Sequence, residues 1–318
     1  MRVLVTGASG FVGAALVTML KRQGHDLVAA TRGPVSVPVD GVEYHAVGDI
    51  GNAPDWQAVL PNIDVVVHAA ARVHVMDERS QDPLQAFRRV NVVATLDLAR
   101  RAAESGARRF IFISSVKVNG EFTLPDRPFR PDDEPAPLDP YGISKLEAEQ
   151  GLLALSRQCA MDVVIIRPVL VYGPGVKANF RSMMNWLCRG IPLPLGAVAN
   201  RRSLVALDNL TDLVATCLAH PAAADQIFLV SDGEDVSTPE LLQRMAGVLG
   251  RRARLVAIPV GWMTAFARVL GRGAIVQRLC GSLQVDITKN ETLLGWRPPV
   301  LMNQALARTA ADYLEHRS

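Results

Sequence analysis

Residues 1–13, MRVLVTGASGFVG, contain the most informative local pattern in the chain. Val3, Leu4 and Val5 form a short apolar run of the kind found in strands that are buried on both faces of a parallel sheet. Gly7, Gly10 and Gly13 follow, and after them comes the helix-like stretch AALVTMLKRQGH. A strand, a glycine-rich turn and a helix in this order predict a site for the phosphates of a dinucleotide.

Each glycine in this turn has a physical reason. Gly7 permits the tight turn, Gly10 lets the backbone approach a pyrophosphate with no Cβ in the way, and Gly13 lets the helix pack closely on the strand. The phosphates would lie at the helix N-terminus, where free N–H groups and the helix dipole favour negative charge. An ordinary strand-to-helix turn is the alternative, but the fully apolar strand before it favours dinucleotide binding.

Composition limits the class of protein. The chain has 318 residues, of which 49% are hydrophobic and 20% charged, enough for a large core in one big domain or two unequal ones. A net charge of +3 does not indicate nucleic acid as a partner. The four cysteines lie far apart with no C-x-x-C spacing, so we expect reduced thiols in a cytoplasmic protein and no metal site.

No segment predicts a membrane span. The N-terminus leads directly into the first strand, so we expect no signal peptide. The most apolar late segment, VAIPVGWMTAFARVLG, contains a proline and an arginine and is too short to cross a bilayer. It could touch a membrane or a partner, although a buried amphipathic helix is the commoner outcome.

Strand and helix patterns alternate along the first half of the chain. Further apolar runs predict strands at residues 26–32, 42–50, 63–71, 108–116 and 161–171, with helical periodicity between them, notably at 82–106 and 141–158. This alternation predicts an α/β fold with a Rossmann-type doubly wound parallel sheet.

The pattern changes from about residue 173. We expect residues 1–172 to form the NAD(P)-binding Rossmann domain, with returns to the sheet at about 203–232. Residues 173–202 and 233–318 would then form a smaller C-terminal substrate-binding lobe, with the ligand in the crevice between the two.

The stretch LDPYGISKLEAEQ carries proton chemistry. Asp139 and Pro140 are typical of an N-cap and a first helical residue, which places Tyr141 and Lys145 on one helical face. A phenol titrates near about pH 10, and a neighbouring ammonium lowers that pKa. Such a tyrosine can exchange a proton with an alcohol or a carbonyl. The pair is also common by chance, in which case it marks only an exposed helix face.

A serine precedes this helix at the carboxyl end of the predicted strand 108–116. Open α/β sheets bind ligands at that edge, where Ser114 or Ser115 can donate a hydrogen bond to a substrate oxygen. A single serine there is usually a cap or turn residue. The argument therefore rests on the combination of the glycine turn, this serine and the pair Tyr141 and Lys145.

With these motifs in this order, the chain resembles the extended short-chain dehydrogenase/reductases. More closely, it resembles the nucleotide-sugar 4-epimerases, 4,6-dehydratases and 4-ketoreductases of the NAD-dependent epimerase/dehydratase family. The resemblance covers nearly the whole chain and rests on TGASGFVG, Asp49-Ile50, VVHAAA, Asn91 in NVVAT, SSVKVNG, YGISK, RPVLVYGPG and RRSLVALDNL.

The resemblance implies that Ser115, Tyr141 and Lys145 are catalytic. Tyr141 would shuttle the proton, Lys145 would hold the nicotinamide ribose and lower the pKa of Tyr141, and Ser115 would orient the sugar oxygen. Asp49 would lie against the adenine and Asn91 behind the active site. The implied cofactor contacts are Gly7, Ser9, Gly10, Phe11, Val12, Gly13, Asp49, Ile50, His68, Ala69, Ala70, Asn91, Tyr141, Lys145 and Pro168. His68 has the alternative of a hydrogen-bonded core histidine.

The resemblance also implies substrate contacts. Asn179 and Arg201 match positions that hold the nucleoside diphosphate, and an arginine fork suits phosphate oxygens. The stretch around Pro194 would pack the nucleobase. Arg278 is the nearest match to a second phosphate-binding arginine, although its spacing to Asp286 differs from the family pattern.

The choice of cofactor depends on the end of the second predicted strand. NAD-preferring folds usually carry Asp or Glu there, whereas this chain has Arg32, which can pair with a 2′-phosphate. We therefore favour NADP(H) over NAD(H). An exposed surface arginine is the alternative.

Departures from the family pattern bear on the reaction. Many epimerases carry a tyrosine at the position of Asn119 and a threonine at that of Lys117. No acidic dyad follows Ser115, which disfavours a dehydratase.

The first hypothesis is reduction of the C4 keto group of a UDP-4-keto-6-deoxy-N-acetylhexosamine in surface polysaccharide (O-antigen) precursor synthesis. The alternatives are a UDP-glucose or UDP-N-acetylglucosamine 4-epimerase and a non-catalytic NADP(H)-binding sensor. By analogy with relatives, we expect a homodimer formed through the helices that hold Tyr141 and residues 92–101.

Overall fold

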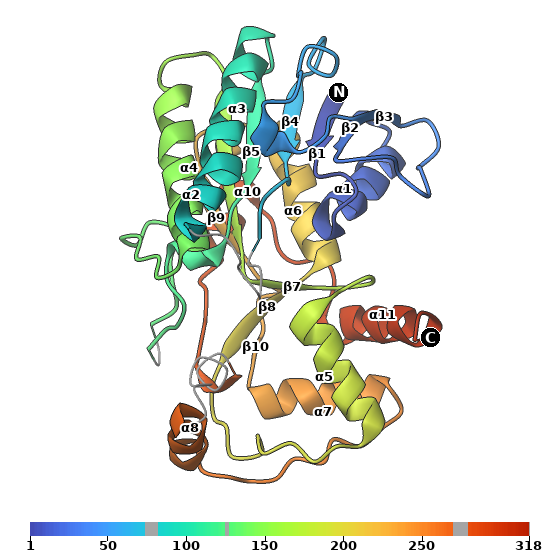
Figure 1. Cartoon of the computed structure of the whole chain (residues 1–318), viewed down its shortest axis with the longest axis vertical. Helices are drawn as coiled ribbons and strands as arrows, with labels where there is room; N and C mark the ends of the chain where they lie inside the picture. Colours follow the sequence, from blue (N-terminus) through green and yellow to red (C-terminus); the bar gives the residue numbers. More distant parts are fainter. Residues whose placement is uncertain (74–81, 125–126, 270–278, 318) are drawn as a thin grey trace.

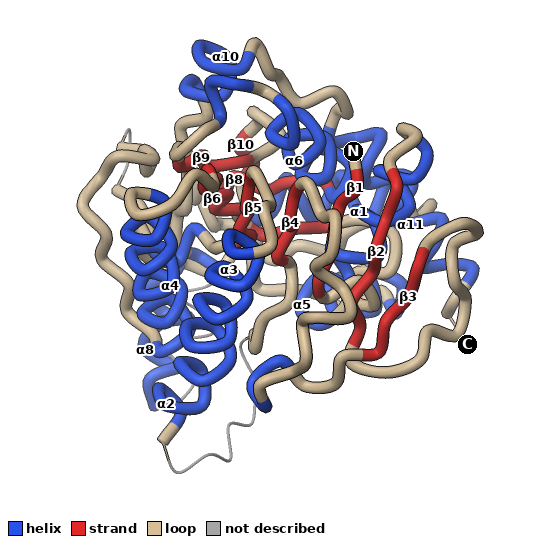
Figure 2. The backbone as a smooth tube through the Cα atoms, turned by 90° about the horizontal axis from the view of Figure 1, so that it is seen from above, coloured by secondary structure: helices blue, strands red, loops and turns tan. Residues whose placement is uncertain are grey.

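The large parallel sheet forms the centre of the protein. The structure, a computed structural model, describes residues 1–73, 82–124, 127–269 and 279–317. Within these residues the large sheet has seven strands in the order β3-β2-β1-β4-β5-β6-β9, and every neighbouring pair is parallel (Figures 1 and 2). Its strands are β1 (Arg2–Thr6), β2 (Asp26–Thr31), β3 (Glu43–Ala46), β4 (Val65–His68), β5 (Arg109–Ile113), β6 (Asp162–Pro168) and β9 (Ile227–Val230). The predicted Rossmann-type fold is confirmed.

Helices cover both faces of this sheet. One face carries α1 (Phe11–Arg22) and α6 (Leu207–Ala219). The other carries α3 (Ala94–Glu104) and α4 (Pro140–Ser156), which lie side by side in Figure 2. The short helix α2 (Pro83–Arg88) leads into α3 through a π-helical turn, η2 (Arg89–Val93). The predicted helix 82–106 is therefore a helix with a π turn in its middle.

Strand β1 shows why its sequence is apolar throughout. Val3 and Val5 point into the core beneath α1 and α6, where Leu16 and Leu213 pack. Leu4 points the other way, into the core shared with α3 and α4. All three β1 side chains are fully buried. Alternation along a strand thus buries both faces, as the continuous apolar run predicts.

A second, smaller sheet joins the large sheet to the C-terminal lobe. It contains β7 (Leu170–Tyr172), β8 (Arg202–Ala206) and β10 (Asp235–Val236), in the order β10-β8-β7. Two predictions are corrected here. The single strand expected at 161–171 is two strands in different sheets, and the chain changes sheet directly after Pro168, which has no N–H to continue the ladder. Of the return at 203–232, β9 joins the large sheet and β8 the small one.

The C-terminal lobe has its own core. It is built from α5 (Ala178–Arg189), α7 (Thr238–Val248) and α11 (Met302–Glu315), whose apolar faces meet beneath the small sheet (Figure 1). The lobe also contains α8 (Val260–Val269), while α10 (Thr288–Leu294) packs near β9. Short 3-10 turns occur at Ile50–Asn52, Val116–Val118 and Pro221–Ala223. None of the described helices is both long and apolar enough to cross a bilayer.

Candidate active site

The glycine turn closes tightly on the neighbouring strands. Gly7 has a φ of +66°, and a Cβ there would lie 2.8 Å from the backbone of Ala70. A Cβ on Gly13 would lie 2.1 Å from the carbonyl oxygen of Gly7, so no side chain fits where α1 crosses the turn. Gly10 is the N-cap of α1, is exposed, and offers no side-chain cap to the helix. These features fit a dinucleotide pyrophosphate, whose oxygens would accept the free N–H groups of the first turn.

Several predicted cofactor residues surround this turn. Ser9 is exposed, and Phe11 and Val12 are half-buried on the first turn of α1. Arg32 follows β2 and is exposed. Ala69 directly follows β4, on the edge of the sheet that the glycine turn occupies. These residues form the rim along which a bound dinucleotide would run.

Asp49 and Ile50 lie just beyond the third strand. Asp49 is exposed and caps the 3-10 turn Ile50–Asn52, because its Oδ1 accepts a hydrogen bond from Gly51 N at 2.9 Å. Ile50 packs against the core beneath α3. Pro168 is buried at the end of β6. None of these contacts tests their assignment to the cofactor.

His68 is a core residue. It is fully buried, its Nδ1 lies 2.7 Å from Thr6 Oγ1, and its Nε2 lies 2.9 Å from Thr95 Oγ1. Burial, followed by the nearby Lys145, lowers the pKa of His68 to about 3, so the ring is neutral at physiological pH. Both ring nitrogens have protein partners, so the side chain does not reach a ligand. The alternative of a hydrogen-bonded core histidine is correct for this side chain.

The three predicted catalytic residues come together. Asp139 caps α4, accepting a hydrogen bond from Gly142 N at 2.7 Å, and Pro140 is the first helical residue, as predicted. Tyr141 and Lys145 therefore lie one turn apart on α4. Ser115 follows β5, where its Oγ accepts a hydrogen bond from Lys117 N at 3.3 Å, and its hydroxyl is near enough to the phenol of Tyr141 to affect the pKa of that phenol. This places a hydroxyl, a phenol and an amine at the edge of the sheet that carries the glycine turn.

Lys145 is held firmly behind the tyrosine. Its Nζ donates to the carbonyl oxygen of Ile113 at 2.8 Å, lies 4.3 Å from the centre of the Phe112 ring and 6.0 Å from that of Tyr141. Only 1% of Lys145 is exposed. Its position is fixed by the strand β5 beneath it, so α4 cannot rotate without breaking these contacts.

The electrostatics of the pair differ from the sequence expectation. Burial, followed by the Asp139 carboxylate, raises the pKa of Tyr141, and the hydrogen bond from Ser115 lowers it. Burial lowers the pKa of Lys145 to about 7, opposed by the carboxylate of Glu149. The Ser115 hydroxyl thus acts against burial and lowers the pKa of the phenol.

A buried ion pair lies directly behind the site. Glu149 and Arg167 are 1% and 2% exposed, and Arg167 Nη2 lies 2.6 Å from Glu149 Oε2. Arg167 Nε is a second donor to the same carboxylate, at 3.0 and 3.2 Å. Ser114 also donates to Glu149. The sequence did not reveal this pair, which ties α4 to the ends of β5 and β6 one turn after Lys145.

Asn91 braces the catalytic helix from the side. It is 1% exposed and lies in the π turn η2. Its Nδ2 donates to Ser144 Oγ and to Arg72 O, both at 3.0 Å, and its Oδ1 accepts from Arg72 N at 2.9 Å. Ser144 in turn donates to the carbonyl oxygen of Tyr141 at 2.8 Å. Asn91 therefore lies behind the site, linked to the helix that carries the tyrosine.

The two departures from the family pattern have structural roles. Asn119 is 2% exposed; its Oδ1 accepts from Arg167 Nη1 and its Nδ2 donates to Arg130 O, both at 3.0 Å. Lys117 pairs with Glu121 Oε1 at 3.1 Å and with the N-cap residue of α4. Both side chains therefore have partners within the fold, around Arg167 and at the start of α4.

The predicted substrate residues are spread over the C-terminal lobe. Asn179 is exposed on the first turn of α5, and Pro194 is exposed in the loop after that helix. Arg201 is exposed, whereas its neighbour Arg202 is half-buried, hydrogen-bonds to Gly281 O at 3.0 Å, and has its pKa lowered by burial. A buried guanidinium suits phosphate recognition better than a solvated one. Arg278 lies outside the described residues.

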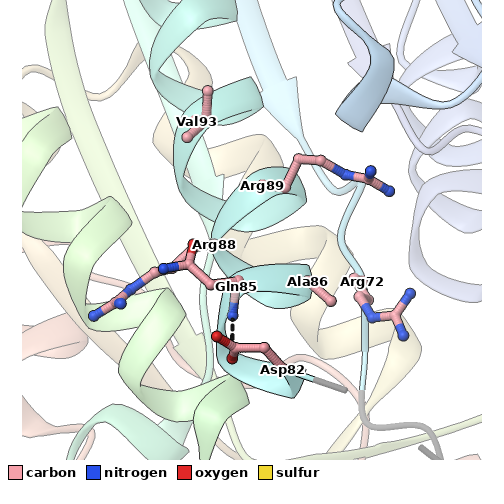
Figure 3. A pocket seen from close by; sticks show the side chains of 7 residues that line it. All are labelled: Arg72, Asp82, Gln85, Ala86, Arg88, Arg89 and Val93. Atoms are coloured by element: carbon pink, nitrogen blue, oxygen red, sulfur yellow. Dashed lines mark hydrogen bonds between the residues drawn. The ribbon is translucent and has the colours of Figure 1, made fainter. Parts of the chain in front are cut away.

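A pocket of about 700 Å³ opens beside the site, on α2 and η2 (Figure 3). Arg88 points away from it toward Glu147 on α4, with Nη2 2.6 Å from Oε1. The pocket is lined by Arg72, Asp82, Gln85, Ala86, Arg88, Arg89 and Val93. None of the three predicted catalytic residues lines this pocket.

The parallel sheet, the glycine turn and the Ser-Tyr-Lys set are together typical of the extended short-chain dehydrogenase/reductases. The chain belongs to the NAD dependent epimerase/dehydratase family, whose sequence model matches residues 3–231. This membership confirms the resemblance noted in the sequence.

Individual relatives give finer comparisons. The chain is 48% identical over 315 residues to a UDP-glucose 4-epimerase of Vibrio cholerae, which covers 98% of this chain and 95% of that protein. It is 27% identical to a 3-beta-hydroxysteroid dehydrogenase of Mycolicibacterium neoaurum, over 99% of this chain and 92% of that one. Among solved structures, MoeE5 in complex with UDP-glucose and NAD superposes over the whole of both chains with a TM-score of 0.80 and 27% identity.

Proposed function

We propose that this chain transfers hydride at C4 of a UDP-linked hexose. The observation that carries the proposal is that Ser115 after β5, Tyr141 at the start of α4 and Lys145 one helical turn later lie on the edge of the sheet that also carries the glycine turn. The relatives support the substrate class, because one is named a UDP-glucose 4-epimerase and another was solved with UDP-glucose and NAD.

The residues have distinct tasks in this reaction. Tyr141 takes the proton from the C4 hydroxyl, or returns it to the developing alkoxide, and Ser115 holds that same oxygen by a hydrogen bond. The cationic form of Lys145 would favour the phenolate of Tyr141 and would hold the cofactor ribose. A bound nicotinamide would supply the hydride acceptor or donor. The free N–H groups after Gly10 would hold the pyrophosphate.

Two candidate reactions use the same residues. The first is 4-epimerisation, in which hydride leaves C4 and returns to the opposite face with no net change in cofactor. The 48% identity to the Vibrio cholerae enzyme over 98% of this chain supports this candidate. It was the alternative hypothesis from the sequence, and this identity is the reason for placing it first.

The second candidate is reduction of a UDP-4-keto-6-deoxy-N-acetylhexosamine, with one NADPH consumed for each sugar. Arg32 is the observation that favours it. The side chain is exposed at the end of β2, and among the described residues it has no hydrogen-bond or ion-pair partner. A free guanidinium at this position can pair with the 2′-phosphate of NADP(H).

One pair of assays distinguishes these reactions. The purified chain is incubated with UDP-glucose or UDP-N-acetylglucosamine and the sugars are followed by NMR, and in parallel with the 4-keto sugar and NADPH or NADH. Interconversion without net cofactor change establishes the epimerase, and stoichiometric oxidation of NADPH establishes the reductase. Cofactor binding with no turnover of any of these sugars would contradict both enzymatic reactions and favour the non-catalytic NADP(H)-binding sensor.

The variant Tyr141→Phe tests the catalytic assignment in whichever assay shows turnover. It removes one hydroxyl from a packed ring, so we expect cofactor affinity to remain and turnover to fall by roughly 10²- to 10⁴-fold, the usual contribution of a positioned acid or base. Phe87→Leu is the control, because that ring packs edge-on to Tyr141 at 6.0 Å and carries no proton. Equal losses in the two variants would count against the role of the phenol.

A further inference from the structure

Positive charge is concentrated in one part of the sequence. Residues 241–285 contain seven arginines and neither Asp nor Glu, although the whole chain has a net charge of only +3. Residues 178–202 contain four arginines and again no acidic residue. Both segments belong to the C-terminal lobe, so this lobe (residues 173–202 and 233–318) is cationic while the rest of the chain is net negative.

Part of this region is an exposed apolar edge. Val256 is 48% exposed and Trp262 is 78% exposed, and Ala257 and Pro259 between them are also exposed. No charged residue interrupts the run from Leu255 to Ala265. The expectation of a buried amphipathic helix is therefore wrong for the tryptophan of this segment. A tryptophan exposed to this extent within an uninterrupted apolar run marks a contact surface.

A neighbouring loop extends this edge. Leu193 N donates to Arg254 O, and Val256 N donates to Leu193 O, both at 2.8 Å, so the two segments run side by side. Ile191 on the neighbouring segment is 41% exposed. In Figure 1 these segments form the lower margin of the molecule, with α8 at one end and the large sheet far above. The margin is thus remote from the glycine turn.

Arginines flank the apolar residues along this margin. Arg251, Arg252 and Arg254 are exposed on the segment that leads to α8, and Arg189 is exposed at the end of α5. Among the described residues none of these four guanidinium groups has a carboxylate partner. Their charge is therefore available to an anionic partner.

We propose that this edge docks on an anionic lipid bilayer, with Trp262 at the level of the headgroups and Arg251, Arg252 and Arg254 against the lipid phosphates. An aromatic ring with an apolar body and one polar N–H suits the membrane interface. Each arginine near an anionic surface strengthens binding roughly fivefold. Attachment is peripheral and holds the catalytic lobe away from the bilayer.

The test is cosedimentation of the full chain with vesicles of phosphatidylcholine, with and without phosphatidylglycerol. We expect binding that requires phosphatidylglycerol and weakens with salt, because salt screens exposed charge. The triple variant Arg251→Ser/Arg252→Ser/Arg254→Ser should lower the partition coefficient on the order of 100-fold. The control Arg22→Ser/Arg100→Ser/Arg157→Ser changes net charge equally, at exposed positions outside this lobe, and should bind like the unmodified chain.

A second variant tests the apolar contact. Trp262→Ser should weaken vesicle binding roughly tenfold or more, since it removes a large apolar side chain from the lipid. Three results would overturn the proposal: equal binding to neutral vesicles, equal loss in the control triple variant, or release of the vesicles by UDP-glucose, which would assign the arginines to the nucleotide. Lipid-independent self-association abolished by Trp262→Ser would instead make this edge an interface between copies of the chain.

Discussion

Replacing Glu149 by glutamine should separate the structural and electrostatic roles of the buried ion pair. The carboxylate holds the Arg167 guanidinium through contacts of 2.6 to 3.2 Å, and neither side chain is more than 2% exposed. Removing one partner of such a pair leaves the other charge buried, at a cost of about 3–5 kcal/mol in the free energy of unfolding. Denaturant unfolding of Glu149→Gln measures this loss.

The same substitution should change the pH dependence of activity. Glu149 raises the pKa of Lys145, which burial has lowered to about 7. Without the negative charge, the pKa of Lys145 falls further. The reaction needs the cationic amine, so activity is lost as the pH rises through this pKa. The alkaline limb of kcat/KM, which reports groups of the free enzyme, should therefore move to lower pH.

Two controls make this test sharp. Glu147→Gln removes a carboxylate from the same helix, but its pair with Arg88 is about one-third exposed. This variant should therefore lose much less stability and leave the alkaline limb of kcat/KM unshifted. The double variant Glu149→Gln/Arg167→Met removes both buried charges. It should be more stable than Glu149→Gln alone, while the alkaline limb of kcat/KM stays at the lower pH. An unshifted limb in a destabilised Glu149→Gln would refute the electrostatic role and leave only a structural one.

Three further predictions concern the glycine turn, the lysine and the phosphate site. Gly13→Ala should abolish measurable cofactor binding in titrations, because its Cβ would lie 2.1 Å from a backbone oxygen, whereas Gly247→Ala, with nothing within 4 Å in α7, should raise stability by about 0.5–1 kcal/mol. The pKa of Lys145 is about 7 in the folded protein and 10.5 in the unfolded chain, so the unfolded chain binds more protons between these values. Stability should therefore rise with pH across that window by up to about 1.4 kcal/mol per unit, and Lys145→Met should flatten the rise in denaturant melts. In steady-state kinetics, Arg202→Ala should raise KM for the nucleotide sugar at least tenfold and Arg201→Ala much less. Equal effects would contradict the assignment of phosphate binding to Arg202, the more buried of the two arginines.

The local motifs were predictable because each depends on neighbouring residues. The N-cap Asp139 with Pro140 fixes where α4 begins, and this in turn fixes the face that carries Tyr141 and Lys145. The glycine turn was recognisable for the same reason, since its constraints lie within a few residues of one strand and one helix. The homodimer and the choice between NADP(H) and NAD(H) stay predictions.

Other parts of the site depend on contacts between distant elements. Glu149 in LEAEQ has the local pattern of a surface helix residue, and only the packing of β6 brings Arg167 against it. The choice between Arg201 and Arg202 depends on strand register, which β8 acquires by pairing Arg202 with Val236 of β10. A shift of one residue along a strand reverses the face, and sequence alone does not fix that shift.

The order of strands in the large sheet has a consequence for synthesis of the chain on the ribosome. Strand β6 lies between β5 and β9, and β9 ends at Val230, more than sixty residues after β6. Until those residues emerge, β6 is an open edge with unpaired backbone groups and an apolar surface. The nascent N-terminal half is then prone to aggregation and dependent on chaperones, and cutting the chain near residue 172 would yield the same unfinished sheet permanently.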